Sequence, residues 1–389
     1  MARGKKNVVD FEELQRERQG RMRRRRVFRL IKLMLLVIAV LLMLGAIDYV
    51  ANYDFGVGIG DTFASFGGPG YPVPVPGGLI RDVRGMGSNL VVLNDTNVQV
   101  YNRSGRLLSN FQHLSDRTAV LTSRDRMLVY EYGGRRVSIH SASRELQVHV
   151  VEDMVLGAAL GAGGEYAIIT SPRTHIAQVE VFNSRFESMI RWGSPQHVRG
   201  VAISPRGDMM VADVVDSFGG VLGAELVFIR FGMREELLRV RLEGELVVHL
   251  SFISDNRIAV LTDRAYRVFD NSGRMVGQYR LPAGMPLTAF QSDGDRMLVL
   301  CGAREARVRE LILLDSSARR TASAEIPGRV RSMALAGRNV WVLTDAGLMR
   351  YNLSLDYIET AEGAGIQRIQ YVDGRLYYFT RYEIRILEG

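Results

Sequence analysis

The sequence predicts an all-β protein, an eight-bladed β-propeller with seven blades as the alternative, behind one N-terminal transmembrane helix. Two observations favour the propeller. Short apolar runs of β-forming residues return about every 40 residues from residue 79 onward, and polar turns separate them. That period, with four short strands per unit, is typical of propellers. A third observation predicts the membrane helix: an uncharged apolar run follows a basic cluster near the N-terminus.

The first element is the predicted membrane anchor at residues 27–50. Its centre, residues 33–47, contains no charged side chain. A hydrocarbon core needs about 20 apolar residues. The run reaches that length from Val27, because Arg29 and Lys32 can extend their charged ends to the headgroups. A cleaved signal peptide is the alternative, but the residues after the run fit a small-residue cleavage site poorly.

The charge of the chain is concentrated before this anchor. The 389 residues include 50 Lys and Arg and 42 Asp and Glu, a formal net charge of +8, and residues 1–32 account for all of that excess. Basic residues beside a span stay in the cytoplasm. Residues 1–26 are therefore predicted to be a cytoplasmic basic tail that contacts anionic lipid, in a single-pass protein of the cell membrane whose C-terminal domain is extracytoplasmic. The rest of the chain has no net charge, which argues against nucleic acid as a partner.

The next element, residues 51–70, is a predicted flexible linker rich in glycine. Residues 71–76 then carry proline at alternate positions, which a strand tolerates only at the edge of a sheet. This segment aligns with the outer strand expected before the seventh unit. The last unit lacks its own fourth strand. We therefore predict that residues 71–76 supply it and close the ring of a propeller that spans residues 71–389.

Each unit of the propeller contains two successive apolar β runs. Residues 90–93 and 98–101 form one copy, and residues 258–261 and 266–269 form another. The turns that follow begin with Asn or Asp and place glycine three residues later, where a positive φ is expected. No unit contains a stretch of helical period, which excludes helical and leucine-rich repeats.

Two turns resemble those of known propeller families. The run Ser204-Pro-Arg-Gly-Asp208 resembles the Ser-Pro-x-Gly turn of WD-like and lactonase-like propellers. The run Val268-Phe-Asp-Asn-Ser-Gly-Arg274 resembles the Asp-x-x-Gly turn of quinoprotein-like propellers. The Trp-Asp ending of WD repeats is absent. The tryptophans that dock quinoprotein blades are also absent, since the chain has only Trp192 and Trp341, so no quinone cofactor is expected.

The layout of the whole chain resembles an uncharacterised family of single-span, membrane-anchored β-propeller proteins of Gram-positive bacteria, a domain of unknown function. A basic tail, one span, a glycine-rich tether and a propeller follow one another in this order. The resemblance extends over nearly the whole chain and implies no active residues.

No chemical motif accompanies the repeats. The 6 histidines never form an H-x-H or H-x-x-x-H pair, so no metal site is predicted. The chain has no G-x-S-x-G elbow and no Walker loop. We therefore assign no catalytic residue and no cofactor, and the protein is predicted not to be an enzyme.

Long connections between the second and third strands are the candidate binding loops. They occur in unit three (171–178), unit four (213–225) and unit six (302–309), and in a propeller such connections open on one face. Apolar residues among the glycines of the unit-four loop suggest an anchor for a partner. The alternative is that they pack back onto the blade. The candidate partner-binding residues are Arg173, His175, Asp216, Phe218, Val221, Leu222, Arg304 and Glu305.

Arginines recur at similar places in the first strands of three units, which are expected to line the central channel. These candidate channel residues are Arg199, Arg331 and Arg368. The function predicted first is a membrane-tethered, extracytoplasmic scaffold that binds a protein or a cell-wall polymer in the cell envelope. The alternative is a propeller enzyme, or a binder of an anionic ligand, that uses the channel.

Overall fold

The structure is a computed structural model, which describes residues 32–40, 67–75, 78–233, 235–303 and 307–387. The chain divides into two compact units, Met1–Thr62 and Phe63–Gly389. In the first unit the described residues 32–40 are helical. The rest of the predicted anchor, the basic tail and most of the predicted linker lie outside the described residues. No helix in the described part of the chain is long and apolar enough to cross a membrane.

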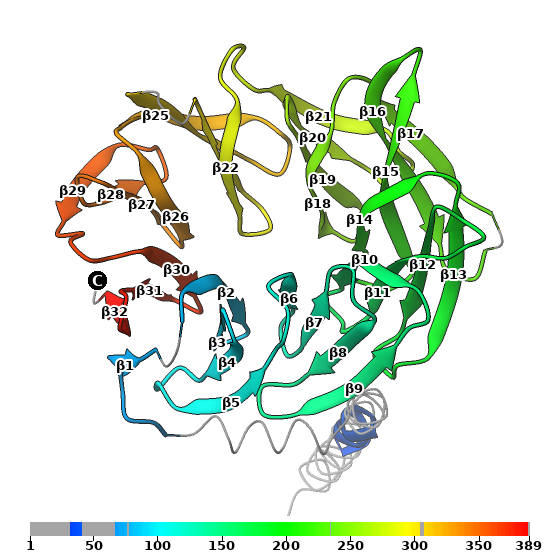
Figure 1. Cartoon of the computed structure of the whole chain (residues 1–389), viewed down its shortest axis with the longest axis horizontal. Coiled ribbons are helices and arrows are strands. Elements are labelled where there is room, and N and C mark those ends of the chain that lie inside the picture. The colour runs from blue at the N-terminus through cyan, green and yellow to red at the C-terminus, as the bar shows by residue number, and fades with distance from the viewer. Residues whose placement is uncertain (1–31, 41–66, 76–77, 234, 304–306, 388–389) are drawn as a thin grey trace, which may run out of the picture. The chain divides into compact units, whose positions relative to one another are not determined.

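The second unit is an eight-bladed β-propeller (Figure 1). Its strands form eight antiparallel sheets of four strands each. Consecutive strands build blades 1 to 7, from β2 to β29, and the last sheet has the order β1-β32-β31-β30. The prediction of eight blades is confirmed, and the alternative of seven is wrong.

The first two strands of each blade lie nearest the centre of the ring. The first strands are β2 (Ile80–Met86), β6 (Thr118–Thr122), β10 (Met154–Leu160), β14 (His197–Ile203), β18 (Val247–Ser254), β22 (Leu287–Ser292), β26 (Val330–Ala336) and β30 (Arg368–Val372). The second strands are β3 (Asn89–Asn94), β7 (Met127–Glu131), β11 (Tyr166–Ser171), β15 (Met209–Phe218), β19 (Arg257–Thr262), β23 (Met297–Cys301), β27 (Asn339–Thr344) and β31 (Arg375–Phe379).

The other two strands of each blade complete the sheet outward. The third strands are β4 (Asn97–Tyr101), β8 (Arg136–His140), β12 (Ala177–Phe182), β16 (Val221–Arg230), β20 (Ala265–Phe269), β24 (Val308–Leu314), β28 (Leu348–Asn352) and β32 (Glu383–Leu387). The outer strands are β5 (Leu107–Gln112), β9 (Glu145–Val150), β13 (Ser188–Ser194), β17 (Leu238–Leu242), β21 (Met275–Arg280), β25 (Arg320–Pro327), β29 (Tyr357–Ala361) and β1 (Val73–Pro74).

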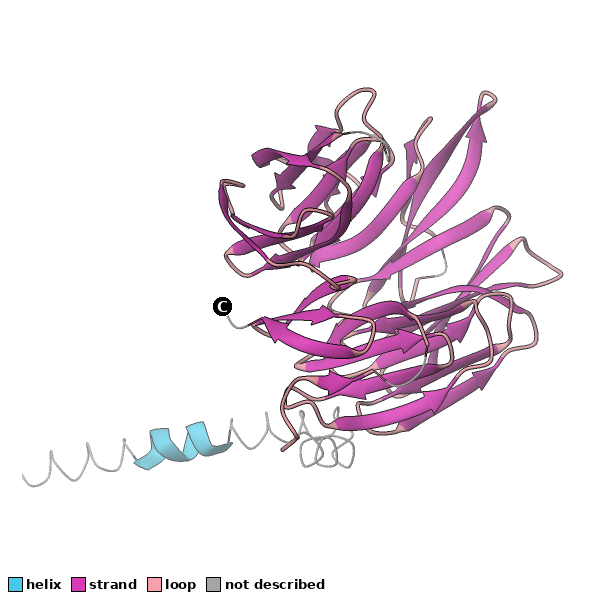
Figure 2. Ribbon diagram, turned by 60° about the vertical axis from the view of Figure 1, so that its left-hand side comes forward, coloured by secondary structure: helices cyan, strands magenta, loops and turns pink. Residues whose placement is uncertain are grey.

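Burial falls from the middle of a blade to its outer edge. Every residue of the second strand β23 is buried, because both faces of its sheet pack against neighbouring blades. The outer strand β29 is exposed over nearly its whole length. Strands and short connections make up the described part of this unit (Figure 2). The apolar runs of the sequence are therefore the second and third strands.

The hydrophobic core is a ring of eight clusters, one at each contact between neighbouring blades. Between blades 3 and 4, for example, Val179 of β12 belongs to the same cluster as Met210 of β15. The cluster between blades 8 and 1 contains Val73, Val83 and Phe379, so the ring closes through the same kind of contact. Each blade therefore depends on two neighbours for burial.

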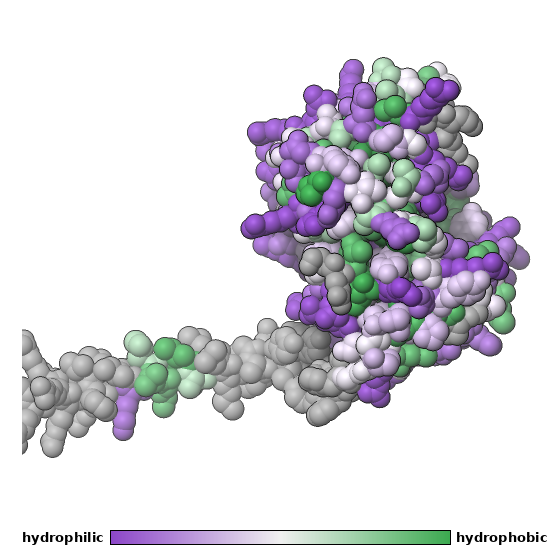
Figure 3. Space-filling model, turned by 90° about the vertical axis from the view of Figure 1, so that its left-hand side faces the viewer, coloured by the Kyte–Doolittle hydropathy of each residue, from purple (hydrophilic) through white to green (hydrophobic). Residues whose placement is uncertain are grey.

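The ring closes on a strand from the N-terminal end of the propeller. Val73 of β1 lies opposite Ile384 of β32, and Pro74 lies opposite Glu383. The outer strand expected at residues 71–76 is thus present as a two-residue strand. Val73 is buried and Pro74 is exposed, which fits an edge position where a missing N–H leaves no ladder bond unmade. The side of the propeller that carries blades 7 and 8 is mostly hydrophilic, with small separate apolar groups (Figure 3).

The chain reaches β1 along the turn that follows β4. The Asn102 side-chain amide donates a hydrogen bond to the carbonyl oxygen of Gly67 at 2.8 Å. The backbone N–H of Gly70 donates to the carbonyl oxygen of Ser104 at 2.9 Å. Residues 67–70 therefore lie on the face of the ring where third strands turn into outer strands.

That turn has the chemistry expected from the sequence. The side-chain oxygen of Asn102 accepts hydrogen bonds from the N–H groups of Ser104 and Arg106, and Gly105 has a φ of 76°. Asp270 begins the same turn in blade 5, where Gly273 has a φ of 72°. Glycine adopts this conformation without strain. In blades 3, 6 and 7 the positive φ falls on other residues: Phe186, Ala318 and Leu355.

Candidate functional site

The connections between second and third strands share one face of the ring, which we call the hairpin face. In an antiparallel four-stranded sheet this connection lies at the opposite end from the other two. All three connections predicted to bind a partner are of this kind, so they lie on the hairpin face together with the links between successive blades. The face opposite carries the turn beside residues 67–70.

The long loop predicted at residues 213–225 is a regular β-hairpin. Strands β15 and β16 have 10 residues each, against 5 to 7 in the other second and third strands. They stay in register up to Phe218 opposite Val221. Gly219 and Gly220 make the turn with φ values of 59° and 85°, as a two-residue hairpin turn requires. The long connection predicted here is therefore wrong, because the two strands continue to a two-residue turn (Figure 1). The pair of glycines permits this turn but does not by itself distinguish it from a longer loop.

The tip of this hairpin exposes two apolar side chains. Val221 is 53% exposed and Leu222 is 55% exposed. Phe218 is partly buried, and the guanidinium carbon of Arg241 in β17 lies 5.3 Å from the centre of its ring, a cation–π distance. Phe218 therefore packs back onto the blade, whereas Val221 and Leu222 face solvent.

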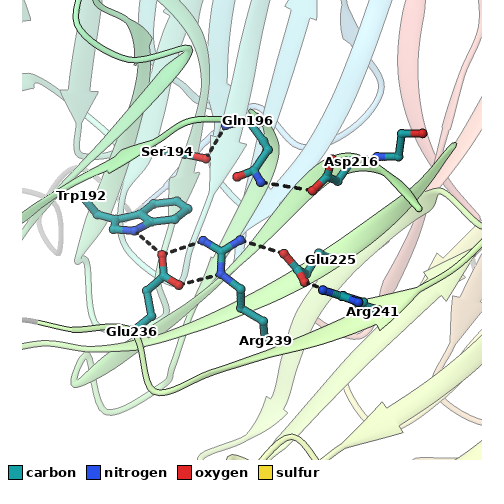
Figure 4. A network of polar contacts seen from close by, with 9 residues as sticks. Trp192, Ser194, Gln196, Asp216, Glu225, Glu236, Arg239 and Arg241 are labelled. Atoms are coloured by element: carbon teal, nitrogen blue, oxygen red, sulfur yellow. Dashed lines mark hydrogen bonds and ion pairs between the residues drawn. The ribbon is translucent and has the colours of Figure 1, made fainter. Parts of the chain in front are cut away.

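A charged network holds the base of the hairpin against blade 3 (Figure 4). Arg239 donates to both carboxylate oxygens of Glu236, at 2.7 and 2.8 Å, and to Glu225 of β16 at 2.7 Å. The indole N–H of Trp192, in β13 of blade 3, donates to Glu236 at 3.0 Å. The hydrogen bond from Arg239 lowers the pKa of Glu236, which is therefore ionised at neutral pH. These charge-assisted bonds fix two blades and the hairpin in one arrangement.

Asp216 has a structural role in the same region. Its carboxylate accepts hydrogen bonds from the side-chain amide of Gln196 at 3.1 Å and from the N–H of Ser217 at 2.7 Å. The backbone N–H of Gln196 is bonded in turn to Ser194 at 3.1 Å. Asp216 thus fastens the hairpin to the link between blades 3 and 4.

The other candidate binding residues differ in their surroundings. Arg173 and His175 lie exposed in the connection between β11 and β12. The ring of His175 covers Gly193 so closely that a Cβ there would come within 2.6 Å of it. Arg304 and Glu305 lie outside the described residues. Val221 and Leu222 are therefore the apolar candidates that the structure leaves accessible on the hairpin face.

A cavity of about 880 Å³ occupies the centre of the ring. The first strand of every blade contributes to its wall, and its size is in the range of ligand-binding pockets. Blades 3 and 4 give small side chains such as Ala159 and Ala202. The polar residues of the wall include Asp82, Arg84, His249, Ser251, Gln291, Ser332, Arg368 and Gln370.

The three predicted channel arginines do not form one ring. Arg331 and Arg368 line the cavity, but Arg199 does not. Arg199 and Arg331 both stand where the first strand shifts register, and a bulge of this kind redirects a side chain. Arg331 pairs with Asp345 at 3.2 Å and donates to the carbonyl oxygen of Thr344 at 3.2 Å. It therefore lies at the end of the channel that opens on the hairpin face.

Sequence reasoning missed two charged residues of the channel. Asp82 of blade 1 accepts a hydrogen bond from Nε of Arg84 at 2.8 Å and from Nη1 of Arg368 at 3.1 Å. Asp82 and Arg84 are two residues apart in β2, so both side chains lie on one side of the strand. The same alternation, compared among the first strands of all the blades, could have identified Asp82 and Arg84 as channel residues from the sequence.

Arg199 acts instead on a buried carboxyl group in the second strand of its own blade. Asp213 of β15 lies opposite Gly200 and is 3% exposed. Burial raises the pKa of Asp213 to about 7, and the charge of Arg199 acts in the opposite direction. One carboxyl oxygen of Asp213 has no hydrogen-bond partner among the described residues. Among those residues no group of three His, Cys, Asp or Glu could hold a metal ion.

The comparison that decides the family is a match over residues 81–364 to the "Family of unknown function (DUF5711)". The chain belongs to the DUF5711 family. The match runs from β2 to the residues after β29, so it covers blades 1 to 7 of this DUF5711 protein. The expected propeller of unknown function is confirmed. Membrane anchoring and the occurrence in Gram-positive bacteria stay predictions. No curated protein matches the sequence.

Several solved structures are similar in fold to the DUF5711 propeller at low sequence identity. The computationally designed Ika8 protein is 14% identical with a TM-score of 0.58, and the similarity covers 80% of this chain and 96% of that one. BamB from Moraxella catarrhalis is 11% identical with a TM-score of 0.52, covering 82% and 97%. A eukaryotic initiation factor is 10% identical with a TM-score of 0.53, covering 84% and 93%. Identities this low support a common fold and carry no function across.

Proposed function

We propose that this DUF5711 protein is a membrane-tethered, extracytoplasmic propeller that acts as a binding scaffold in the cell envelope. The tip of the β15–β16 hairpin would hold a protein partner or a cell-wall polymer. The observation that supports this best is the exposure of Val221 and Leu222 at the end of the longest strand pair in the propeller. Apolar side chains in such a position are typical anchors for a partner.

The rigidity of the hairpin adds support. Its base is fixed by Glu225 and Asp216, which bond to residues of β17 and of the link to blade 3. A contact residue held in place before binding loses less conformational entropy when the partner arrives. An apolar tip on a fixed hairpin suits stable capture better than the same residues on an irregular loop would.

The path of the chain before β1 supports a tether attached on the face opposite the hairpin face. Residues 67–70 run beside the turn after β4, away from the hairpin face. A tether that arrives there leaves the hairpin face open to a partner. The proposed scaffold therefore binds on one face and is attached through the other.

Location and tethering are tested by cysteine labelling in intact cells. Cys301 is buried, so the native chain supplies a low background. We expect Leu222→Cys to react with a membrane-impermeant maleimide in intact cells, and Asp10→Cys to react only after lysis. Labelling of Asp10→Cys in intact cells, or protection of Leu222→Cys until lysis, would contradict the proposed topology.

Binding is tested with a photo-crosslinking amino acid at position 222 in the native envelope. The matched control is position 276 in β21, where Val276 is also apolar and 41% exposed. We expect a specific adduct at 222 that is absent at 276. With the captured partner purified, Leu222→Ser should weaken binding at least tenfold. The same adducts at both positions, or unchanged affinity of the variant, would exclude the hairpin as the binding site.

A further inference from the structure

The charged residues of the central channel are unbalanced. Among the residues that line the cavity, Arg84, Arg331 and Arg368 carry positive charge and Asp82 carries negative charge. Asp82 is shared by Arg84 and Arg368, with N···O distances of 2.8 and 3.1 Å. One carboxylate between two guanidinium groups leaves a net positive charge on this group of three residues. The carboxylate also aligns the two guanidinium groups, since both bond to it.

The two guanidinium groups keep donors for a ligand. Arg84 uses its Nε on Asp82 and Arg368 uses Nη1. Within the part of the chain that the structure describes, Asp82 is the partner of both side chains, so their remaining N–H groups have solvent in the channel. Arginine has a planar fork of N–H donors that suits a carboxylate or phosphate group.

The wall of the channel opposite this pair carries polar side chains. His249 of β18 stands in blade 5, across the ring from Arg84 in blade 1. Burial, together with the charge of Arg84, lowers the pKa of His249, so the histidine is neutral at physiological pH. Its Nε2 lies 3.0 Å from the hydroxyl oxygen of Ser251. A ligand bound by Arg84 therefore meets neutral polar groups on the far side, and Asp82 is the one carboxylate among the described residues that line the cavity.

We infer that the central channel binds a small ligand through an oxyanion group, a carboxylate or a phosphate, held by Arg84 and Arg368. The cavity of about 880 Å³ accepts a molecule of metabolite size. While the site is empty, the carboxylate of Asp82 offsets the electrostatic repulsion between the two guanidinium groups. This site lies inside the ring, does not include the hairpin tip and does not depend on the scaffold proposed above.

The test is calorimetric titration of the full-length chain in detergent with two probes, pyrophosphate and citrate. We expect at least one of them to bind with one site per chain. Binding of pyrophosphate alone assigns a phosphate ligand, and binding of citrate alone assigns a carboxylate ligand. Arg84→Gln and Arg368→Gln should each weaken binding at least about tenfold, because each removes a charged hydrogen-bond donor. Asp82→Asn should tighten binding, because it removes the negative charge beside the ligand.

Two controls make the outcome decisive. Arg191→Gln changes an exposed arginine of β13 that also pairs with a carboxylate, Glu180, and should leave binding unchanged. Both channel arginines are partly exposed, so their glutamine variants are expected to fold; the unfolding temperature of each variant checks this. No heat with either probe at millimolar concentration would overturn the inference. Binding that survives both channel substitutions would also overturn it, because the anion would then be bound by the basic tail.

Discussion

Asp82 in the first blade accepts a hydrogen bond from Arg368 in the eighth at 3.1 Å, although the two residues are 286 positions apart in the sequence. The bond crosses the seam where the ring closes. It lies in the channel, while the apolar cluster around Val73 closes the same seam further out. Ring closure therefore combines a polar contact in the channel with an apolar contact at the edge.

The seam predicts an effect for its shortest strand. Val73→Ala removes buried apolar volume from β1 and should lower the free energy of unfolding by about 2 kcal/mol. Pro74→Ala, at the exposed neighbouring position, should change it by less than about 0.5 kcal/mol. Urea unfolding of both variants measures the difference. Equal stability of the Val73→Ala variant and the native chain would show that β1 does not hold the ring closed.

The network at the hairpin base predicts a larger effect. Glu225 is 4% exposed and receives its shortest hydrogen bond from Arg239. Arg239→Leu should lower the free energy of unfolding by about 2–4 kcal/mol, because a buried carboxylate loses its main partner. Arg191→Leu, which breaks the surface pair with Glu180, should cost less than about 1 kcal/mol. Adding Glu225→Gln to Arg239→Leu should recover part of the loss; further destabilisation by the second change would contradict this account.

Asp213 predicts a pH dependence of stability. Its pKa is about 7 in the folded chain against about 3.9 in the unfolded chain, so the folded state favours the protonated form. The stabilisation from that proton is fully present below about pH 4 and is lost as the pH rises through 7. Asp213→Asn keeps a neutral side chain, so its stability relative to the native chain should increase between pH 4 and pH 8. Thermal unfolding across this range measures it, with Asp125→Asn as the matched exposed control. A difference that does not change with pH would contradict the shift.

The turn after β4 predicts a strict requirement for glycine. At Gly105, with a φ of 76°, an added Cβ would come within 2.6 Å of the carbonyl oxygen of Gly70. Gly105→Ala should therefore lower the unfolding free energy by about 2 kcal/mol or more, from backbone strain and from the clash. Gly133 has a similar φ of 79° and open space around it, so Gly133→Ala should cost only the strain, about 1 kcal/mol. Equal losses would show that the contact with Gly70 is unimportant.

The candidate site was harder to predict than the fold. The apolar tip at Val221 and Leu222 is visible in the sequence, but its form is not, because the two glycines at 219 and 220 allow either a loop or a tight turn. Of the three arginines expected in the channel, Arg331 and Arg368 line the cavity and Arg199 does not. A shift of one residue reverses the side of a strand on which a side chain lies, so similar spacing in the sequence does not secure the same direction.

By itself the sequence determined the number of blades, the second and third strands of each blade and the turns after the third strands. These features depend on neighbours within about 40 residues: apolar runs form buried strands, and Asn102 or Asp270 bonds to the backbone just ahead of it. The tertiary structure alone decided that Asp82 bonds to Arg368, that Trp192 bonds to Glu236 and that Arg199 acts on Asp213. Each of these pairs joins different strands or blades, and the geometry of a contact between distant segments is set only when the whole ring packs.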